Sequence, residues 1–233
     1  MKRNLKIGII AAMEKEISTI KAAIENMETV KCGGIDFYIG KIGEKEIVAA
    51  QCGIGKVFAA MCAQAMILKF SPDCIINTGV AGSLTRELKI LDCMIADSVV
   101  QHDMDTSAIG DEVGMISGIN VVEIYTSRNV SELLMAAAEK CSVHIAYGKI
   151  ATGDKFIAED ADRDRIRNVF RADCCEMEGG AIGQVCYVNK VPFGIVRTIS
   201  DSFGEDSGMD YMTFAGIAAE NSAKLTLEFI NLA

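Results

Sequence analysis

Short apolar runs alternate with helical segments along most of this chain, and the alternation restricts the folds open to it. Residues 5–11, 74–78 and 193–200 have the length and composition of buried strands. Apolar residues at helical spacing follow the first strand at 17–28. The segment 53–56 begins a second, Ala- and Met-rich helix that ends near residue 70. Strands that alternate with helices predict a parallel or mixed sheet covered by helices on both faces.

The other elements extend the same pattern. Residues 35–40 and 46–51, joined by a turn at Gly43, are typical of a hairpin, which makes the expected sheet mixed. The Gly-rich stretch 79–82 predicts a turn, and 101–120 is the longest candidate loop. Further strands are expected at 92–100, 121–126, 144–152 and 174–178, and further helices at 131–141, 161–170, from 179 onward and at 210–232. We expect an α/β fold: a single-domain three-layer sandwich over residues 1–233, its central mixed β-sheet flanked by helices.

Composition argues against nucleic acid and membrane partners. Hydrophobic residues make up 50% of the chain and aromatic residues 6%, with no tryptophan, so aliphatic side chains and methionine must form the core. A net charge of -9 repels a phosphate backbone, and we expect no nucleic acid partner. The segment 7–13 superficially resembles a very short signal peptide, but no apolar run approaches the ~20 residues that span a bilayer. We expect a cytoplasmic protein with no membrane partner.

Cysteine and histidine usage argues against metals and disulfides. The nine cysteines form no Cys-x-x-Cys pair and mostly lie inside apolar segments, as expected of buried free thiols in a reducing compartment. His102 and His144 are the only imidazoles, and the thiol spacings do not match a zinc site. We expect no metal.

Two glycine motifs could suggest a cofactor, but each is incomplete. Gly53-x-Gly55 follows a strand, yet Phe58 stands at the third glycine position of a dinucleotide fingerprint, and the acidic residue is missing. Lys56 is followed by Val57 where a phosphate-binding loop uses Ser or Thr. We expect no cofactor.

Three acidic segments lie far apart in the chain, each near the expected end of a strand: 13–16, 176–180 and 197–201. In an open α/β sheet, ligands bind beyond the carboxyl ends of the strands, so acids placed there can converge on one substrate. Converging carboxylates suggest acid/base chemistry at a glycosidic-type bond.

Each acid also has a purely structural explanation. Glu16 lies in a first helical turn, where the macrodipole favours its ionised form whether it is a dipole partner or a base that activates water. Glu176 and Glu178 would share one face of a short strand, either held by backbone N–H groups or free to accept hydrogen bonds from sugar hydroxyls. Arg197 and Asp201 share a strand face, which fits an ion pair; alternatively, Asp201 is a proton donor at a ligand rim.

Six segments taken together, at residues 8–16, 53–56, 76–82, 153–157, 176–178 and 197–201, resemble the methylthioadenosine/S-adenosylhomocysteine nucleosidases. The match runs in order from about residue 5 to about residue 230. Single motifs are shared across the nucleoside phosphorylase superfamily, whereas the Met-Glu-x-Glu start is more specific to the hydrolases. The resemblance implies a nucleoside phosphorylase-like fold, an adenine nucleoside substrate and a homodimer.

The resemblance also implies roles for the acids. Asp201 would protonate purine N7, Glu16 would activate water, and Glu178 would hold the ribose 2′- and 3′-hydroxyls around an oxocarbenium-like transition state. Phe156 would stack on the purine, and backbone groups of Ile157 would read its edge. Ser200 and Arg197 would orient the acids. The sugar and thioether pocket would be lined by Met13, Ile54, Met177 and Tyr211, and the Gly-rich segment would add Val80 and Gly82 to the binding residues.

Three positions depart from the family pattern. Val80 stands where a serine is common, and Ser117 stands where a proline is common. Ile109 stands where the family often has an aromatic residue that closes the thioether pocket of a neighbouring subunit, so the loop 101–120 is the candidate donor to that site. Preference between the methylthio and the homocysteinyl substituent therefore stays open, and 5′-deoxyadenosine is a further candidate.

The same residues leave three other functions open. A phosphorylase needs cationic groups around its phosphate, whereas the segment 13–16 is acidic. A hydrolase of 6-amino-6-deoxyfutalosine would share the same acids. A nucleoside-binding module would retain such ligands without turning them over.

Overall fold

The computed structural model describes residues 5–141, 143–204 and 207–233. In chain order, its strands are β1 Lys6–Ala11, β2 Glu25–Cys32, β3 Ile35–Ile42, β4 Lys45–Gln51, β5 Cys74–Ser83, β6 Cys93–Gln101, β7 Glu123–Tyr125, β8 Ile145–Thr152, β9 Cys174–Glu176 and β10 Phe193–Asp201. Its helices are α1 Glu14–Ala23, α2 Lys56–Phe70, α3 Arg128–Lys140, α4 Asp160–Phe170, α5 Gly179–Asn189 and α6 Ser207–Leu232, with a short 3₁₀ turn, η1, at Ser107–Ile109.

The strands join in one mixed sheet in the order β10-β6-β8-β9-β5-β1-β4-β3-β2, with β7 beside β6. Because β10 also pairs with β5, the strands β5, β10, β6, β8 and β9 close into a ring, and β1 to β4 extend from β5 as an open sheet. Strand β5 is parallel to both β1 and β10. The carboxyl ends of these three strands therefore lie at one edge, as the sequence predicted for the acids.

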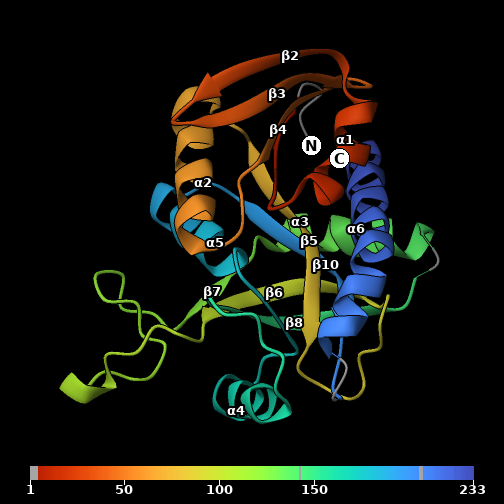
Figure 1. Cartoon of the computed structure of the whole chain (residues 1–233). Coiled ribbons are helices and arrows are strands. Elements are labelled where there is room, and N and C mark those ends of the chain that lie inside the picture. The colour runs from red at the N-terminus through yellow and green to blue at the C-terminus, as the bar shows by residue number, and fades with distance from the viewer. Residues whose placement is uncertain (1–4, 142, 205–206) are drawn as a thin grey trace.

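Helices cover both faces of the sheet (Figure 1). One apolar cluster packs α1, α3 and α6 against the sheet, and another packs α2 and α5 against the opposite face. This arrangement confirms the expected three-layer α/β sandwich with a mixed sheet. All nine cysteines are free, and seven are buried. Within the described residues, no helix is both long and apolar enough to cross a bilayer.

The first helix is shorter than its spacing predicted. The pattern Ile17, Ile20, Ile24, Met27 suggested a helix to residue 28, but α1 ends at Ala23 and the chain continues as the edge strand β2. Asn26 has a left-handed φ of 50°, where the pairing of β2 with β3 shifts register. Pairing with β3 thus overrides a helical pattern whose last member, Met27, is exposed.

The Gly-rich segment is a strand, which corrects the predicted turn at 79–82. Strand β5 continues to Ser83, with Gly82 paired to both β9 and β10. Its glycines serve close approach instead of chain reversal: a Cβ at Gly79 would collide with the side chains of Arg197 and Glu16. At Gly82 a Cβ would lie 2.7 Å from Oδ2 of Asp201.

Candidate active site

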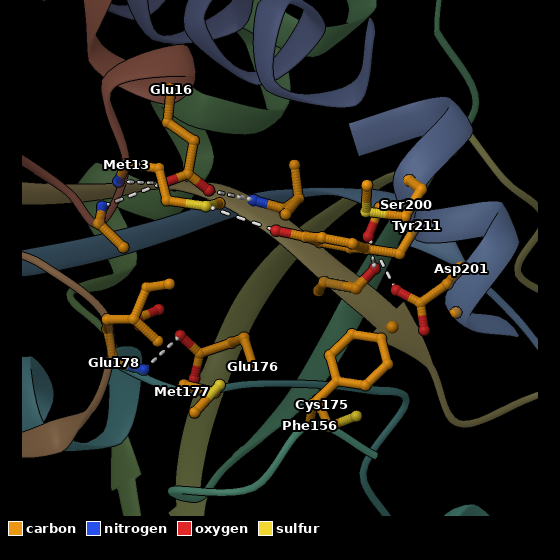
Figure 2. Close-up of a pocket in the computed structure, with 17 residues that line it drawn as sticks. Met13, Glu16, Phe156, Cys175, Glu176, Met177, Glu178, Ser200, Asp201 and Tyr211 are labelled. Atoms are coloured by element: carbon orange, nitrogen blue, oxygen red, sulfur yellow. Dashed lines mark hydrogen bonds between the residues drawn. The ribbon is translucent and has the colours of Figure 1, made fainter. Parts of the chain in front are cut away.

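A pocket of about 340 Å³ opens at the carboxyl edge of the sheet. Twelve of the residues named from the sequence line it: Met13, Glu16, Ile54, Val80, Gly82, Phe156, Glu176, Met177, Glu178, Ser200, Asp201 and Tyr211. Figure 2 shows the carboxyl groups of Glu16, Glu178 and Asp201 on different sides of this pocket, with Tyr211 and Phe156 between them. Acids from three distant segments therefore share one cavity.

Glu16 is held at the start of α1 by three backbone N–H groups. Its Oε2 accepts hydrogen bonds from Ala12 (3.0 Å) and Met13 (2.9 Å), and its Oε1 accepts one from Val80 (3.0 Å). Burial raises the pKa of Glu16, against the opposing influence of Arg197 and these N–H groups. The sequence argument from the helix dipole alone missed this desolvation, which makes Glu16 a stronger base than an exposed glutamate.

Glu176 and Glu178 have different environments, which corrects the expectation that they share one strand face. Strand β9 ends at Glu176, and Glu178 is the N-cap residue of α5. Glu176 accepts hydrogen bonds from Thr152 and Arg197 and from the backbone of Glu178 and Gly179, so it is fully occupied by the protein. Glu178 faces the pocket, and its Oε1 accepts a hydrogen bond from Gly55 N (2.9 Å).

Arg197 is buried behind these glutamates, outside the pocket lining. It forms an ion pair with Glu176, and its Nη2 lies 3.7 Å from Oε2 of Glu178. The alternative of an Arg197–Asp201 ion pair is wrong: Arg197 pairs with Glu176 and Asp201 pairs with Arg163. Four residues along a strand separate the Cα atoms of Arg197 and Asp201 by about 13 Å. Burial and the Glu176 charge raise the pKa of Glu178 to about 7, although Arg197 opposes them.

Asp201 ends β10 at the opposite side of the pocket. The Ser200 hydroxyl donates to its Oδ1 (2.8 Å), and Arg163 of α4 donates to its Oδ2 (2.5 Å). Asp201 and Arg163 are both buried. Its charge partner is thus Arg163, which lies on the helix predicted at 161–170 and was not among the residues named from the sequence.

Apolar groups line the rest of the pocket. The Tyr211 hydroxyl donates to Sδ of Met13 (3.4 Å), and the rings of Tyr211 and Phe156 meet edge to face with centroids 5.4 Å apart. Met212 of α6 adds a second methionine near Tyr211 that the sequence analysis did not name. Sulfur and aromatic surfaces suit an uncharged, polarisable substituent.

Besides Arg197, two residues named from the sequence do not line the main pocket. Ile157 is buried and lines a small adjoining cavity of about 30 Å³ with Phe156 and Asp201. Ile109 is 82% exposed on η1. Figure 1 shows the segment between β6 and β7 that carries η1 projecting from the body of the molecule.

Sequence reasoning missed Arg163, although a signal was present. Arg163, Ile166 and Phe170 lie three and seven residues apart, so they share one face of α4. That face is buried, and an arginine on it needs an acidic partner. Among the described residues, no group of three or more His, Cys, Asp or Glu side chains is arranged to hold a metal ion.

Comparison with known proteins shows the family of the chain. The model of the phosphorylase superfamily matches residues 6–231. The chain is 38% identical over 233 residues to the 5′-methylthioadenosine/S-adenosylhomocysteine nucleosidase of Psychromonas ingrahamii, covering 97% of this chain and 99% of that protein. It is 35% identical over 226 residues to the aminodeoxyfutalosine nucleosidase of Campylobacter jejuni, covering 97% and 96%.

A solved structure shows the same similarity in three dimensions. The 5′-methylthioadenosine/S-adenosylhomocysteine nucleosidase of Neisseria meningitidis, in complex with methylthio-immucillin-A, superposes with a TM-score of 0.94 at 33% identity, covering 98% of this chain and 99% of that one. With its mixed sheet, its convergent carboxyl groups and these full-length matches, the chain belongs to the 5′-methylthioadenosine/S-adenosylhomocysteine nucleosidase family of the phosphorylase superfamily.

Proposed function

We propose that the protein hydrolyses the N-glycosidic bond of 5′-methylthioadenosine and S-adenosylhomocysteine, releasing adenine and the corresponding thioribose. The observation that supports this most is the meeting of Glu16, Glu178 and Asp201 around one pocket with methionine and aromatic walls. The nucleosidase relatives, one of them solved with a methylthio-immucillin, support the same substrate class.

Asp201 and Phe156 serve the purine in this proposal. Phe156 stacks on the base, and Ile157 reads its edge from the adjoining cavity through backbone groups. Asp201, oriented by Ser200, gives a proton to N7 as the C1′–N9 bond breaks. The bonding electron pair then leaves with a neutral adenine, which is a far better leaving group than its anion.

Glu178 and Glu16 serve the sugar and the water. Glu178 accepts hydrogen bonds from the vicinal ribose hydroxyls. Arg197 lies beside its carboxyl group, and Glu176, the ion-pair partner of Arg197, accepts a hydrogen bond from its backbone N–H. Glu16, whose pKa is raised by burial, takes a proton from the water that attacks the anomeric carbon. The positive charge that develops on the ribose is stabilised by these carboxylates.

A direct assay of adenine release tests the proposal. Purified protein is incubated with each nucleoside, with and without phosphate, and adenine and sugar products are separated. Hydrolysis yields free thioribose at a rate independent of phosphate. A sugar 1-phosphate product would make the protein a phosphorylase, and binding without adenine release would make it a nucleoside-binding module.

The substrate range belongs to the same experiment. The similarity to an aminodeoxyfutalosine nucleosidase favours 6-amino-6-deoxyfutalosine as a second candidate substrate. The values of kcat/KM for this compound, the two thionucleosides and 5′-deoxyadenosine rank the candidates directly. A preference for aminodeoxyfutalosine of more than tenfold would reassign the main activity.

Asp201→Asn tests the proton donor. The amide keeps the shape of the carboxyl group and accepts from Arg163, but it cannot donate an acidic proton. We expect kcat for adenine release to fall by roughly 10²- to 10⁴-fold while the fold stays intact. The thermal unfolding midpoint should fall as well, because the buried Arg163 loses its counter-charge. A variant with wild-type turnover would remove Asp201 from this role.

We also propose a homodimer located in the cytoplasm. Helix α2 is apolar on all sides: Ala59, Cys62 and Met66 face the core, while Val57 and Leu68 are exposed. A groove of about 700 Å³ runs along α2. A helix that is apolar all round is normally buried, and an exposed apolar face marks a site of protein–protein contact. In the dimer, the projecting segment with Ile109 would reach the pocket of the neighbouring subunit. Free buried thiols fit a reducing compartment.

A further inference from the structure

Arg163 is a buried cation inside the most charged helix of the protein. Its side chain is 0% exposed, although α4 carries charged residues along most of its length. Burying a guanidinium without a counter-charge costs several kcal/mol, so the structure must supply a partner. The partner is Asp201, whose Oδ2 accepts from Nη2 of Arg163 at 2.5 Å.

The contacts of Arg163 fix the guanidinium on the side of Asp201 away from Ser200. Nη1 of Arg163 donates to the carbonyl oxygen of Ser83 at the end of β5 (2.5 Å), and this second anchor sets the plane of the group. Phe203 lies over the guanidinium, with its ring centroid 5.9 Å from the central carbon. This distance is within the range of a cation–π contact with the guanidinium.

Asp201 is consequently held at both oxygens. Ser200 donates to Oδ1 and Arg163 to Oδ2, and Gly82 leaves room for the pair because a Cβ there would lie 2.7 Å from Oδ2 and 3.0 Å from Nη1. Ser200 and Asp201 line the main pocket, whereas Arg163 does not. The guanidinium therefore acts on the carboxyl group from outside the substrate space.

We propose that Arg163 is a positioning residue for the proton transfer to the leaving base. It holds the Asp201 carboxyl group in one orientation. Because Asp201 is the counter-charge of Arg163, it takes up a proton from solvent before it donates one to purine N7, and the fixed positive charge of Arg163 stabilises the carboxylate that this donation restores. The bonding pair of C1′–N9 leaves with adenine, and Asp201 later regains a proton from solvent. This role rests on the proposed function, since it acts only through Asp201 as the acid.

A purely structural salt bridge would predict different kinetics. If the pair only fastens α4 to the sheet, its loss lowers stability and affects every substrate alike. If Arg163 acts through Asp201, its loss lowers kcat more than it changes KM, and only for leaving groups that need a proton. A 4-nitrophenyl 5-methylthioriboside is the probe, because nitrophenolate departs without protonation.

The experiment compares Arg163→Met, Arg163→Lys and a control, Arg167→Met, each in the full-length chain. Arg167 is on the same helix and is also ion-paired, with Asp173 at 2.7 Å, but it is partly exposed and does not line the pocket. For methylthioadenosine we expect Arg163→Met to lower kcat by roughly 10- to 100-fold, Arg163→Lys to restore it to within about tenfold, and Arg167→Met to leave it unchanged. For the nitrophenyl riboside all variants should match the wild type.

Coupling to Asp201 completes the test. In an Asp201→Asn background, adding Arg163→Met should change kcat by less than about twofold, because the group through which Arg163 acts is already lost. The double variant also leaves no unpaired buried charge, so it keeps the test valid if Arg163→Met alone unfolds. Equal losses on both substrates, or an undiminished effect in the Asp201→Asn background, would overturn the role. A wild-type protein that releases no adenine refutes the proposed function itself, and the role of Arg163 with it.

Discussion

Burial controls the charge of the glutamates around the pocket. Glu16 and Glu178 are both nearly inaccessible, and desolvation is the largest influence raising the pKa of each. Arg197 lies close enough to both to oppose that rise, so one buried cation serves two pocket carboxyl groups as well as Glu176. Glu178 is affected most clearly, because the Glu176 charge adds to its desolvation.

The raised pKa of Glu178 predicts a specific pH dependence of stability. Its pKa rises from 4.5 to about 7 on folding, so the folded state holds a proton that the unfolded state has lost in this window. The free energy of unfolding contributed by Glu178 therefore falls as pH increases from about 4.5 to about 7. Glu178→Gln stays neutral and still accepts from Gly55, so we expect it to exceed the wild type in stability above pH 7 by about 1 to 3 kcal/mol and to converge with it near pH 5.

Urea unfolding at pH 5 and pH 8 measures this difference. Glu44→Gln, at an exposed position of the turn between β3 and β4, is the matched control. A Glu178→Gln variant that is less stable than the wild type at pH 8 would show that the Glu178 charge stabilises the fold.

At the scale of elements, β5 carries the geometry of the site. It lies between β1 and β10, which bring Glu16 and Asp201 to its two sides, and its residues from Gly79 to Gly82 pass within contact distance of both acids. A side chain at these positions would fill the space that the carboxyl groups and their arginine partners occupy. The glycines are thus required by tertiary packing, because neither Gly79 nor Gly82 has a left-handed φ.

Gly79→Ala tests the packing requirement of β5. The new methyl group would overlap the guanidinium of Arg197 and the carboxyl group of Glu16, both of which are buried. We expect a loss of stability of about 1 to 3 kcal/mol, as for other overpacked cores, together with lower adenine release. Gly216→Ala is the control: Gly216 is exposed on α6 with nothing within 4 Å of the added Cβ, and alanine there should stabilise by about 0.5 to 1 kcal/mol. Equal stability of the two variants in thermal unfolding would contradict the argument.

At the scale of the whole molecule, the outward face of α2 is exposed among the described residues, with Val57 and Leu68 at its surface. The proposed dimer covers this face and brings the Ile109 segment of one subunit toward the pocket of the other. Subunit association and the completeness of the site would then depend on the same surface.

A charge-introducing variant separates these effects. Leu68 is 74% exposed on α2, so Leu68→Glu leaves the fold of one subunit intact but places an unpaired charge in the proposed interface. We expect light scattering to shift from dimer toward monomer, with kcat/KM for methylthioadenosine falling in parallel. Ile217→Glu, at an exposed position of α6, is the control and should remain dimeric. A wild-type protein that is monomeric and fully active would exclude a shared site.

The sequence by itself determined the elements and the acids. Hydrophobic periodicity located the helices and all strands except β2, because burial on one face leaves the same spacing in any such fold. Spacing also placed Glu16 and Asp201 near strand ends, and the motif resemblance supplied the pocket residues. The single-domain organisation over residues 1–233 stays a prediction.

Only the tertiary structure decided which charged side chains form ion pairs and which residues line the pocket. Arg197 pairs with Glu176 instead of Asp201, and Asp201 pairs with Arg163, because pairing across strands brings together residues from distant parts of the chain. The end of α1 and the extension of β5 through Gly82 were likewise set by neighbouring strands. Local spacing carries no information about these partners, since an ion pair depends on distance in space and on the desolvation that a finished core imposes.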